Sequence, residues 1–252
     1  MRLANKKVIV TGGGSGFGAA MCRLFAKEGA RVLVADINGE AAAKVAREIG
    51  SAAVPFTVDV SDGKQVKAMI EKAISSFGDL DTVVNNAGFT HRNMPMLDVD
   101  EATFDRVFAV NVKSIYWAAQ AAVPHFRKRG GGTFLNISSV AGIRPRPRLT
   151  WYNASKAATN ILTKSMAVEL APDKIRVNVV CPGLVETPML PQFMSRGGNV
   201  DDATKRYLVG VPMGRVGVAT EIAKAALFLA SDEDASYVTG VALPVDGGYT
   251  AR

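Results

Sequence analysis

The sequence predicts an α/β fold, in which a doubly wound parallel sheet carries helices on both faces. Short runs of apolar and β-branched residues alternate along the chain with longer amphipathic stretches, as strands alternate with helices. Strands separated by helices need crossover connections, which make the strands parallel and cover both faces of the sheet. The sequence contains no repeat, low-complexity tract or obvious linker, so residues 1–252 are expected to form a single domain.

Seven apolar runs are expected to form the strands of this sheet. Each run is short and rich in Val, Ile, Leu or Ala, as a strand buried on both faces should be. The expected strands lie at residues 6–10, 31–36, 53–60, 82–88, 132–139, 176–183 and 240–248.

Six amphipathic stretches between these runs are expected to form helices. Their apolar residues recur at helical spacing, which gives each helix one face for the sheet. The fourth stretch is the longest and holds Pro124 near its end. The expected helices lie at residues 17–28, 40–49, 62–77, 103–128, 152–171 and 220–230.

Residues 186–213 do not fit either pattern. The segment is rich in Pro, Gly, Met and Arg, and its helical signal is weak. It follows the carboxyl end of a strand, which is where ligands bind in open α/β sheets. We expect a substrate lid at about 186–213; the alternative is a passive surface excursion.

Composition excludes several classes of protein. The net charge is +7, but the basic residues are scattered apart from a short run at 127–129, so nucleic-acid binding is not expected. An acidic substrate, cofactor or partner is a better use of the charge. Cys22 and Cys181 are too few for a disulfide framework or zinc site, and His91 and His125 are too isolated for a metal site or hydrolase triad. We expect no metal.

No window of the sequence holds 18 uninterrupted apolar residues, so no membrane span is expected. The first residues run from basic side chains directly into an apolar strand, without the apolar stretch and cleavage site of a signal peptide. We therefore expect a cytoplasmic protein.

A glycine-rich turn, TGGGSGFG at residues 11–18, joins the first strand to the first helix. Glycine permits positive φ and close approach of a ligand to the backbone. The helix N-terminus then offers N–H groups and a partial positive charge to a pyrophosphate. The dinucleotide fingerprint G-x-G-x-x-G/A fits as Gly14, Gly16 and Ala19. Any tight turn from strand to helix also favours glycine, so the turn alone does not decide.

Asp36 ends the second strand, 20 residues after Gly16, where an acid that binds the ribose hydroxyls belongs. Its carboxylate would repel a 2′-phosphate. Positions 15 and 37 are occupied by Ser15 and Ile37, so neither carries a cation that could bind such a phosphate. We expect NAD rather than NADP as the cofactor. The alternative for Asp36 is a capping or turn aspartate. Asp59, at the end of the third strand, could accept from an adenine amine, although turn chemistry explains it equally well.

Tyr152 and Lys156 stand four residues apart on an expected helix, so their side chains share one face. A phenol has a pKa of about 10, and a nearby ammonium favours its ionisation. Such a tyrosine can act as general acid for carbonyl reduction or general base for alcohol oxidation. Ser139, at the end of the fifth strand, could hydrogen-bond the substrate oxygen as charge develops there.

These motifs resemble those of the classical short-chain dehydrogenase/reductase family, and the resemblance extends over nearly the whole chain. In the order of the family they are TGGGSGFG at 11–18, NNAG at 85–88, Asn111, Ser139, YNASK at 152–156, and PG at 182–183 followed by Thr187. The resemblance implies an NAD(P)-dependent oxidoreductase with a seven-stranded Rossmann sheet, usually a homotetramer. The family spacing between serine and tyrosine selects Ser139 rather than Ser138.

The resemblance also implies roles for individual residues. The catalytic group is Ser139, Tyr152, Lys156 and Asn111, in which the asparagine holds a water that links the lysine to solvent. The backbone near Val185 and the Thr187 hydroxyl bind the carboxamide. The residues expected to bind the cofactor are Gly12, Ser15, Gly16, Phe17, Gly18, Asp36, Ile37, Asp59, Val60, Asn86, Ala87, Gly88, Tyr152, Lys156, Pro182, Gly183, Val185 and Thr187.

The segment IRPRPRLTW at 143–151 is unusually basic and proline-rich for a place beside a substrate. Its prolines favour extended backbone, so its three arginines need not share a face. An arginine that turns inward would suit a carboxylate, sulfonate or phosphate; the alternative is a solvated or subunit-interface segment. The candidate substrate residues are Arg144, Arg146, Arg148, Trp151, Met94 and Arg196.

The leading functional prediction is an NAD-dependent oxidoreductase that acts on a secondary alcohol or ketone. An anionic hydroxy compound is one candidate for this substrate. A 3-oxoacyl-[acyl-carrier-protein] reductase is the second enzyme hypothesis, in which Arg127, Arg129 and Arg176 would receive an acidic carrier; Asp36 argues against it. A cofactor-sensing scaffold is the third hypothesis, because fold does not fix function. Apolar surface on the helices at 103–128 and 152–171 favours pairing between subunits.

Overall fold

The computed structural model describes residues 1–188, 190–194 and 200–251. Its seven strands form one parallel sheet in the order β3-β2-β1-β4-β5-β6-β7, which confirms the predicted doubly wound sheet. The strands are β1 Lys7–Thr11, β2 Arg31–Asp36, β3 Ala53–Thr57, β4 Thr82–Asn85, β5 Gly132–Ile137, β6 Ile175–Pro182 and β7 Ala242–Val245.

The strand order reverses between β1 and β4, and this reversal positions the binding site. The chain adds β2 and β3 on one side of β1, then returns to pair β4 with the other side of β1. The crossover helices on the two sides of this point diverge. They leave a crevice at the carboxyl ends of β1 and β4.

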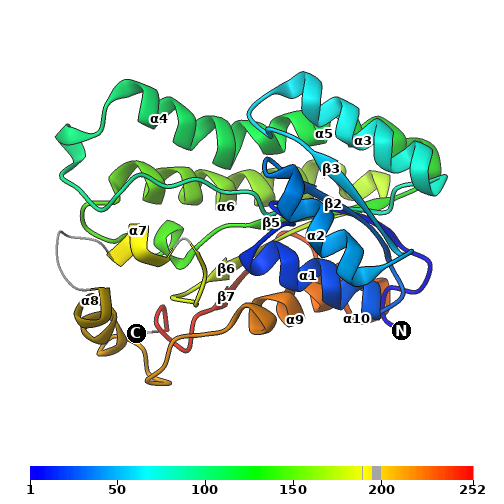
Figure 1. Ribbon diagram of the computed structural model, residues 1–252. Coiled ribbons are helices and arrows are strands. Elements are labelled where there is room, and N and C mark those ends of the chain that lie inside the picture. Colours follow the sequence, from blue (N-terminus) through cyan, green and yellow to red (C-terminus); the bar gives the residue numbers. More distant parts are fainter. Residues whose placement is uncertain (189, 195–199, 252) are drawn as a thin grey trace.

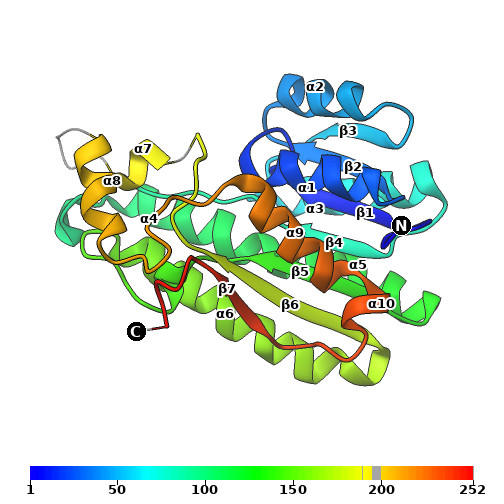
Figure 2. The same cartoon turned by 90° about the horizontal axis from the view of Figure 1, so that it is seen from below.

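Helices cover both faces of the sheet (Figures 1 and 2). One face packs on α1 Gly16–Lys27, α2 Gly39–Ile49 and α9 Ala219–Ala230, followed by the short α10 Asp232–Ala235. The other face packs on α3 Gly63–Phe77, α5 Ser114–Arg129 and α6 Thr150–Leu170, with α4 Glu101–Phe108 leading into α5. Two separate apolar cores result, one on each side of the sheet.

The helix starts follow from capping side chains in the sequence. Asn38 accepts from Ala41 N at 3.0 Å and starts α2. Asp62 accepts from Lys64 N at 2.8 Å and starts α3. These side chains satisfy N–H groups that have no partner inside the helix.

The helix predicted over 103–128 is interrupted, which corrects that prediction. Residues Ala109–Lys113 form a π-helical turn between α4 and α5. Within this turn the Asn111 amide donates to Phe89 O at 2.9 Å and accepts from Phe89 N at 2.8 Å. A side chain that bonds another segment's backbone favours a local insertion, and π-turns occur often at functional sites. Pro124 lies inside α5, near its end, as predicted.

Several strand boundaries also differ from the prediction. The fourth strand ends at 85 rather than 88, the fifth at 137 rather than 139, and the seventh spans 242–245 rather than 240–248. The third strand ends at Thr57 rather than at 60, because Asp59 Oδ1 accepts from both Ser61 N and Ser61 Oγ and so forms a turn. The described residues of the predicted lid at 186–213 include α7 Leu190–Met194 and α8 Val200–Leu208, although the helical signal of this segment is weak. Acidic residues in the first turn of α8 and basic residues in its last turn complement the helix dipole.

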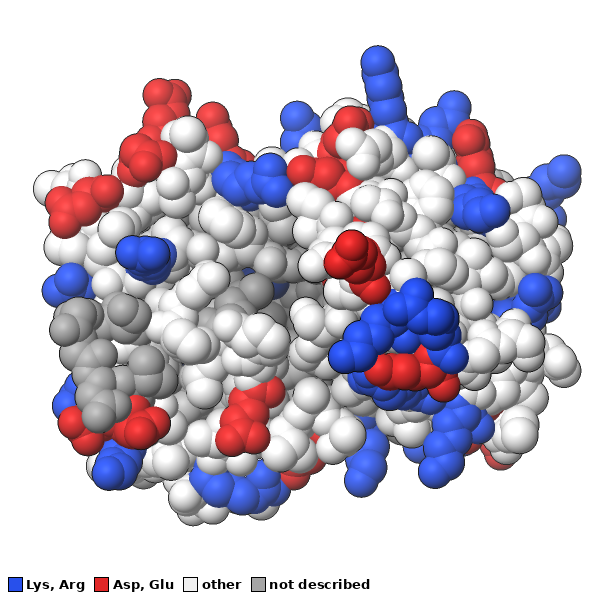
Figure 3. All heavy atoms as spheres, in the orientation of Figure 1, with Lys and Arg blue, Asp and Glu red and all other residues white. Residues whose placement is uncertain are grey.

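Charged side chains of both signs are interspersed on the face that Figure 3 shows. This distribution matches their scatter along the sequence. Within the part of the chain that the structure describes, no helix is both long enough and apolar enough to span a bilayer.

Candidate active site

A cavity of about 450 Å³ opens where the strand order reverses. Loops that follow six of the seven strands contribute to its wall, as the position of the crevice requires. The cavity brings together most of the residues that the sequence singles out. Those that line it are Gly12, Ser15, Gly16, Phe17, Asp36, Ile37, Asp59, Val60, Asn86, Ala87, Gly88, Ser139, Arg146, Tyr152, Pro182, Gly183, Val185 and Thr187.

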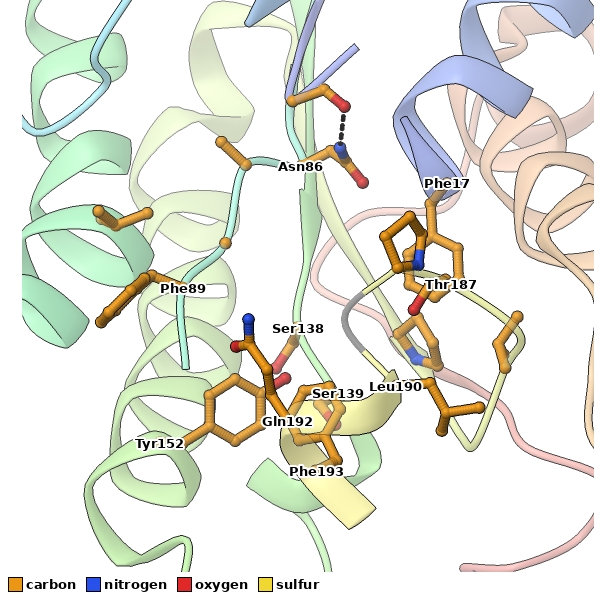
Figure 4. A pocket seen from close by; sticks show the side chains of 18 of the residues that line it. Phe17, Asn86, Phe89, Ser138, Ser139, Tyr152, Thr187, Leu190, Gln192 and Phe193 are labelled. Atoms are coloured by element: carbon orange, nitrogen blue, oxygen red, sulfur yellow. Dashed lines mark hydrogen bonds between the residues drawn. The ribbon is translucent and has the colours of Figure 1, made fainter. Parts of the chain in front are cut away.

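The glycine-rich turn forms one end of the cavity. Gly12 has a φ of +63° and Gly16 a φ of +49°, conformations that other residues rarely adopt. Gly18 does not line the cavity, but a Cβ there would collide with the Gly12 carbonyl oxygen. Asn86 Nδ2 holds the turn by donating to Thr11 O at 2.7 Å and to Gly12 O at 3.2 Å (Figure 4).

The N-terminus of α1 is suited to an anion. Ser15, its N-cap residue, makes no capping hydrogen bond with its side chain, and the first turn of α1 holds no acidic residue. The partial positive charge of the helix is therefore not offset by a carboxylate in its own first turn. The residues at this end fit the pyrophosphate of a dinucleotide.

Asp36 stands at the edge of the same end of the cavity. Its Oδ2 accepts from Gly14 N at 2.9 Å, and its Oδ1 accepts from Asn38 N at 2.9 Å. The carboxylate thus orients the glycine-rich turn while it faces the cavity. Each oxygen has a further lone pair for a ribose hydroxyl, so the turn role and the ribose role are compatible.

Tyr152 and Ser139 lie together deeper in the cavity, beside Phe193 (Figure 4). Burial raises the pKa of Tyr152 to about 12, while hydrogen bonding by Ser139 and the positive charge of Arg146 act in the opposite direction. Ser139 Oγ accepts from Ala141 N at 3.1 Å, which fixes the side chain at the start of the next turn. The Tyr152 phenol and the Ser139 hydroxyl therefore lie beside each other in the cavity.

Lys156 and Asn111 lie behind this wall rather than on it. Lys156 Nζ donates to Ile137 O at 3.0 Å and stands 5.8 Å from the centroid of the Tyr152 ring. Burial lowers the pKa of Lys156 to about 8. A Cβ added at Gly88 would lie 3.6 Å from both Lys156 Nζ and Asn111 Oδ1, so Lys156 and Asn111 meet beside Gly88, which lines the cavity.

Stability should depend on pH through Lys156. Its pKa in the folded protein, about 8, is below the ordinary 10.5. Between these values the unfolded chain binds a proton that the folded chain does not, so stability rises with pH in this window. We expect the difference in unfolding free energy between wild type and Lys156→Met to shift by about 2 kcal/mol in favour of wild type from pH ~8 to ~10.

Urea unfolding at a series of pH values measures this shift. Lys164→Met, an exposed change on the same helix, is the matched control and should show a difference that is independent of pH. A constant difference for Lys156→Met across the window would contradict the lowered pKa.

The structure separates the three arginines of the 143–151 segment. Arg146 lines the cavity. Arg144 lies outside it, where it donates to Tyr249 O at 2.9 Å and stacks on the Tyr249 ring. Arg148 is exposed, with a φ of +67°, and its carbonyl accepts from Met94 N at 3.1 Å.

Trp151 and Met94, two further candidate substrate residues, are not brought to the cavity. Trp151 donates from Nε1 to Met96 O at 3.2 Å and packs edge-on against Phe104. Neither Trp151 nor Met94 is among the described residues that line the wall. Arg196 lies outside the described residues.

Several side chains that line the cavity were not predicted from the sequence. Phe89, Arg106, Leu190, Gln192, Phe193 and Tyr207 all contribute to its wall. Arg106 forms an ion pair with Asp59 at 3.3 Å. Leu190, Gln192 and Phe193 come from α7 and Tyr207 from α8, so a stronger helical reading of 186–213 would have pointed to them.

Among the described residues, no group of three or more His, Cys, Asp and Glu side chains could hold a metal ion. Cys22 and Cys181 are both buried, and burial raises the pKa of the Cys181 thiol to about 11. Neither cysteine is among the described residues that line the cavity.

This chain matches known proteins over nearly its whole length, both in sequence and in structure. The family model described as Enoyl-(Acyl carrier protein) reductase matches residues 12–250. The 4-formylbenzenesulfonate dehydrogenase of Comamonas testosteroni is 48% identical over 251 residues, which cover 98% of this chain and 99% of that protein.

Two solved structures are also similar. A 3-ketoacyl-(acyl-carrier-protein) reductase from Brucella melitensis, complexed with NADH, has a TM-score of 0.92 at 41% identity, with 98% of this chain and 99% of that chain covered. A short-chain type dehydrogenase/reductase from Mycobacterium marinum has a TM-score of 0.91 at 35% identity, with 99% and 97% covered.

Proposed function

The chain belongs to the classical short-chain dehydrogenase/reductase family, and we propose from this premise that it interconverts a secondary alcohol and its ketone with NAD as the preferred cofactor. One observation carries the proposal. The Tyr152 hydroxyl and Ser139 face a cavity that continues without interruption to the glycine-rich turn. A substrate at the tyrosine would therefore lie beside the reactive end of a dinucleotide held by that turn.

The side chains divide the chemistry between them. When bound, the nicotinamide ring supplies or accepts the hydride. In the direction of oxidation, Tyr152 takes the proton of the substrate hydroxyl, and Ser139 hydrogen-bonds the substrate oxygen and holds it in place. Burial opposes ionisation of the phenol, whereas Ser139 and the charge of Arg146 favour it. Lys156 Nζ stands 5.8 Å from the centroid of the Tyr152 ring, and Asn111 lies with it beside Gly88, so we infer that these two residues pass on the proton that Tyr152 takes.

Asp36 supports the preference for NAD. The carboxylate borders the cavity next to the glycine-rich turn, where a 2′-phosphate would meet a like charge. The neighbouring Ile37 is apolar and 60% exposed, so it offers such a phosphate no compensating charge.

The substrate proposed here is an anionic hydroxy compound. The dehydrogenase of Comamonas testosteroni is named for a sulfonate, and Arg146 supplies a cation to the cavity. A screen of neutral and anionic secondary alcohols with NAD and with NADP, followed by formation of the reduced cofactor, tests the proposal. Turnover with NAD is expected; no turnover of any alcohol with either cofactor would refute it.

A 3-oxoacyl-[acyl-carrier-protein] reductase remains the second candidate, because the similar Brucella melitensis protein bears that name. The arginines predicted to receive an acidic carrier are already paired within the chain. Arg127 pairs with Asp173, Arg129 with Asp81, and Arg176 with Asp232. Reduction of an acetoacetyl carrier protein faster with NADPH than any alcohol is oxidised with NAD would favour this candidate.

We further propose that residues 186–213 act as a lid and that the protein is a homotetramer. The helices α7 and α8 lie together at one end of the molecule (Figures 1 and 2) and supply Phe193 and Tyr207 to the cavity wall.

The proposed homotetramer is supported by apolar side chains that stand exposed on α5 and α6: Tyr116 is 48%, Ile161 64% and Val168 80% exposed. Such surface favours pairing between subunits, and analytical ultracentrifugation measures the assembly.

A further inference from the structure

We propose that Asn93 is a positioning residue of the active site, which bonds the last turn of α7 and so holds Phe193 against the ring of Tyr152. The inference rests on the proposed function, because it concerns the shape of the same site. Asn93 is not among the described residues that line the cavity, whereas Phe193 and Tyr152 both are. Asn93 would therefore act on the substrate through Phe193.

The contact between Phe193 and Tyr152 depends on a very short helix. Their ring centroids lie 5.2 Å apart (Figure 4), and Phe193 belongs to α7, which has five residues. The last four carbonyls of a helix have no partner inside it, and isolated helices of this length are not stable in water. The position of Phe193 therefore has to be fixed from outside α7.

Asn93 supplies two of the missing partners. Its backbone N–H donates to Gln192 O at 3.3 Å, and its side-chain Nδ2 donates to Phe193 O at 3.4 Å. Both bonds are long, but together they bind two consecutive carbonyls of α7 from one residue. Met194, the next residue of α7, is buried. Burial of apolar surface is not directional, so the two hydrogen bonds fix the orientation of the helix.

The loop that carries Asn93 is anchored on both sides. Met94 N donates to Arg148 O at 3.1 Å, which joins the loop to the segment before α6. At the start of the loop, the Asn111 side chain bonds both the N–H and the carbonyl of Phe89. The loop can therefore hold α7 in a fixed place.

The burial of the Asn93 amide supports a role beyond packing. Only 4% of the residue is exposed, and its Oδ1 has no hydrogen-bond partner within the described part of the chain. A leucine has nearly the same shape and would bury no such oxygen. An amide at this position therefore points to use of its N–H group, which donates to Phe193 O.

Two alcohols of different size test the inference by turnover. Asn93→Leu keeps the shape of the side chain and removes the donor. With NAD, we expect its KM for 1-phenylethanol to rise about tenfold and its kcat to stay within about twofold, because Phe193 borders the space for a ring but transfers no proton. KM for 2-propanol, which offers Phe193 little surface, should change less than about twofold. Unchanged KM values for both alcohols would overturn the inference.

Thr90→Val is the matched control. It also removes one donor from a buried side chain of the same loop, where Thr90 Oγ1 donates to His91 O at 3.0 Å. This hydrogen bond does not involve α7, so both KM values should stay those of wild type. An equal rise of KM in Thr90→Val and Asn93→Leu would assign the effect to the loop as a whole and overturn the role of Asn93.

Limited proteolysis tests the position of α7 without turnover. Chymotrypsin can cut after Phe193 only when α7 leaves its place, so the rate of this cut reports the open population. We expect Asn93→Leu to raise the rate about tenfold, relative to the cut after the fully exposed Tyr237. The thermal midpoint should not fall, because the variant buries no unpartnered oxygen. Equal rates in wild type and variant, or a rise at both cuts with a lower midpoint, would overturn the inference.

The two results are read independently. A faster cut after Phe193 without turnover of either alcohol supports the role of Asn93 and refutes the proposed reaction. Turnover of both alcohols by Asn93→Leu with wild-type KM values leaves the proposed function intact and overturns the inference. Asn93→Asp serves if Asn93→Leu does not fold. It keeps the size of the side chain and replaces the donor by a carboxylate oxygen, so it should raise the rate of the cut in the same way.

Discussion

Replacement of Tyr152 by Phe is expected to lower kcat for alcohol oxidation by about a thousandfold, the range that a general acid or base contributes. The substitution removes one oxygen and leaves the ring, which packs on Phe193 at 5.2 Å and lies 5.8 Å from Lys156 Nζ. The wall of the cavity therefore keeps its shape. Steady-state kinetics with NAD and a saturating alcohol measures the loss.

The control for this prediction separates chemistry from folding and binding. The Kd for NADH, followed by cofactor fluorescence, and the thermal midpoint should stay close to those of wild type. Tyr116→Phe removes a hydroxyl from an exposed ring on α5 and should leave kcat unchanged. If Tyr152→Phe retained more than about a tenth of the wild-type kcat, the tyrosine would not be the proton-transfer group.

Replacement of Asp36 by Asn is expected to raise the ratio of kcat/KM with NADP to that with NAD by about a hundredfold. The change removes the charge that repels a 2′-phosphate and weakens the acceptor for the ribose hydroxyls. Asn keeps one oxygen, so either Gly14 N or Asn38 N retains its partner. Most of the effect should therefore come from charge rather than from disorder of the turn.

The measurement is a comparison of the two oxidised cofactors at one fixed alcohol concentration. Glu40→Gln neutralises an exposed acid in the first turn of the next helix, α2, and should leave the ratio unchanged. An unaltered ratio in Asp36→Asn would mean that Asp36 only braces the glycine-rich turn. A rise in the ratio in both variants would point to the general field of the protein instead.

The strands and the cofactor end of the cavity were predictable because their signals are local. A short apolar run predicts a buried parallel strand, and the glycines at 11–18 predict the turn there. Asp36 follows from its position at the end of the second run. The spacing of Tyr152 and Lys156 places them on one helical face, but it does not indicate that burial separates their pKa values. That separation depends on the depth at which α6 packs against the sheet.

The parts that could not be predicted depend on contacts between distant segments. The π-turn at Asn111 exists because its side chain bonds the backbone of Phe89, which no helical pattern reveals. Similarly, Arg144, Arg146 and Arg148 occupy alternate positions of one short segment, and the sequence does not say which one faces inward. The extended backbone predicted there is wrong at Arg148, which adopts a φ of +67° within a turn. Tyr207 and Tyr249 decide that question, and they stand far from the arginines in sequence.

The Tyr207 and Tyr249 rings stack at 4.8 Å between centroids, with the Arg146 guanidinium 4.8 Å from the Tyr207 centroid and that of Arg144 4.8 Å from the Tyr249 centroid. These contacts make one loop common to both halves of the cavity. Tyr249 belongs to the turn after β7, whose Asp246 packs so closely behind Gly183 that a Cβ there would come within 2.7 Å of the Asp246 Cα. Gly183 faces the dinucleotide half of the cavity, and Tyr207 faces the half around Tyr152. Position 249 is therefore a place where protein engineers could adjust selectivity and coenzyme affinity together from a residue outside the described cavity lining.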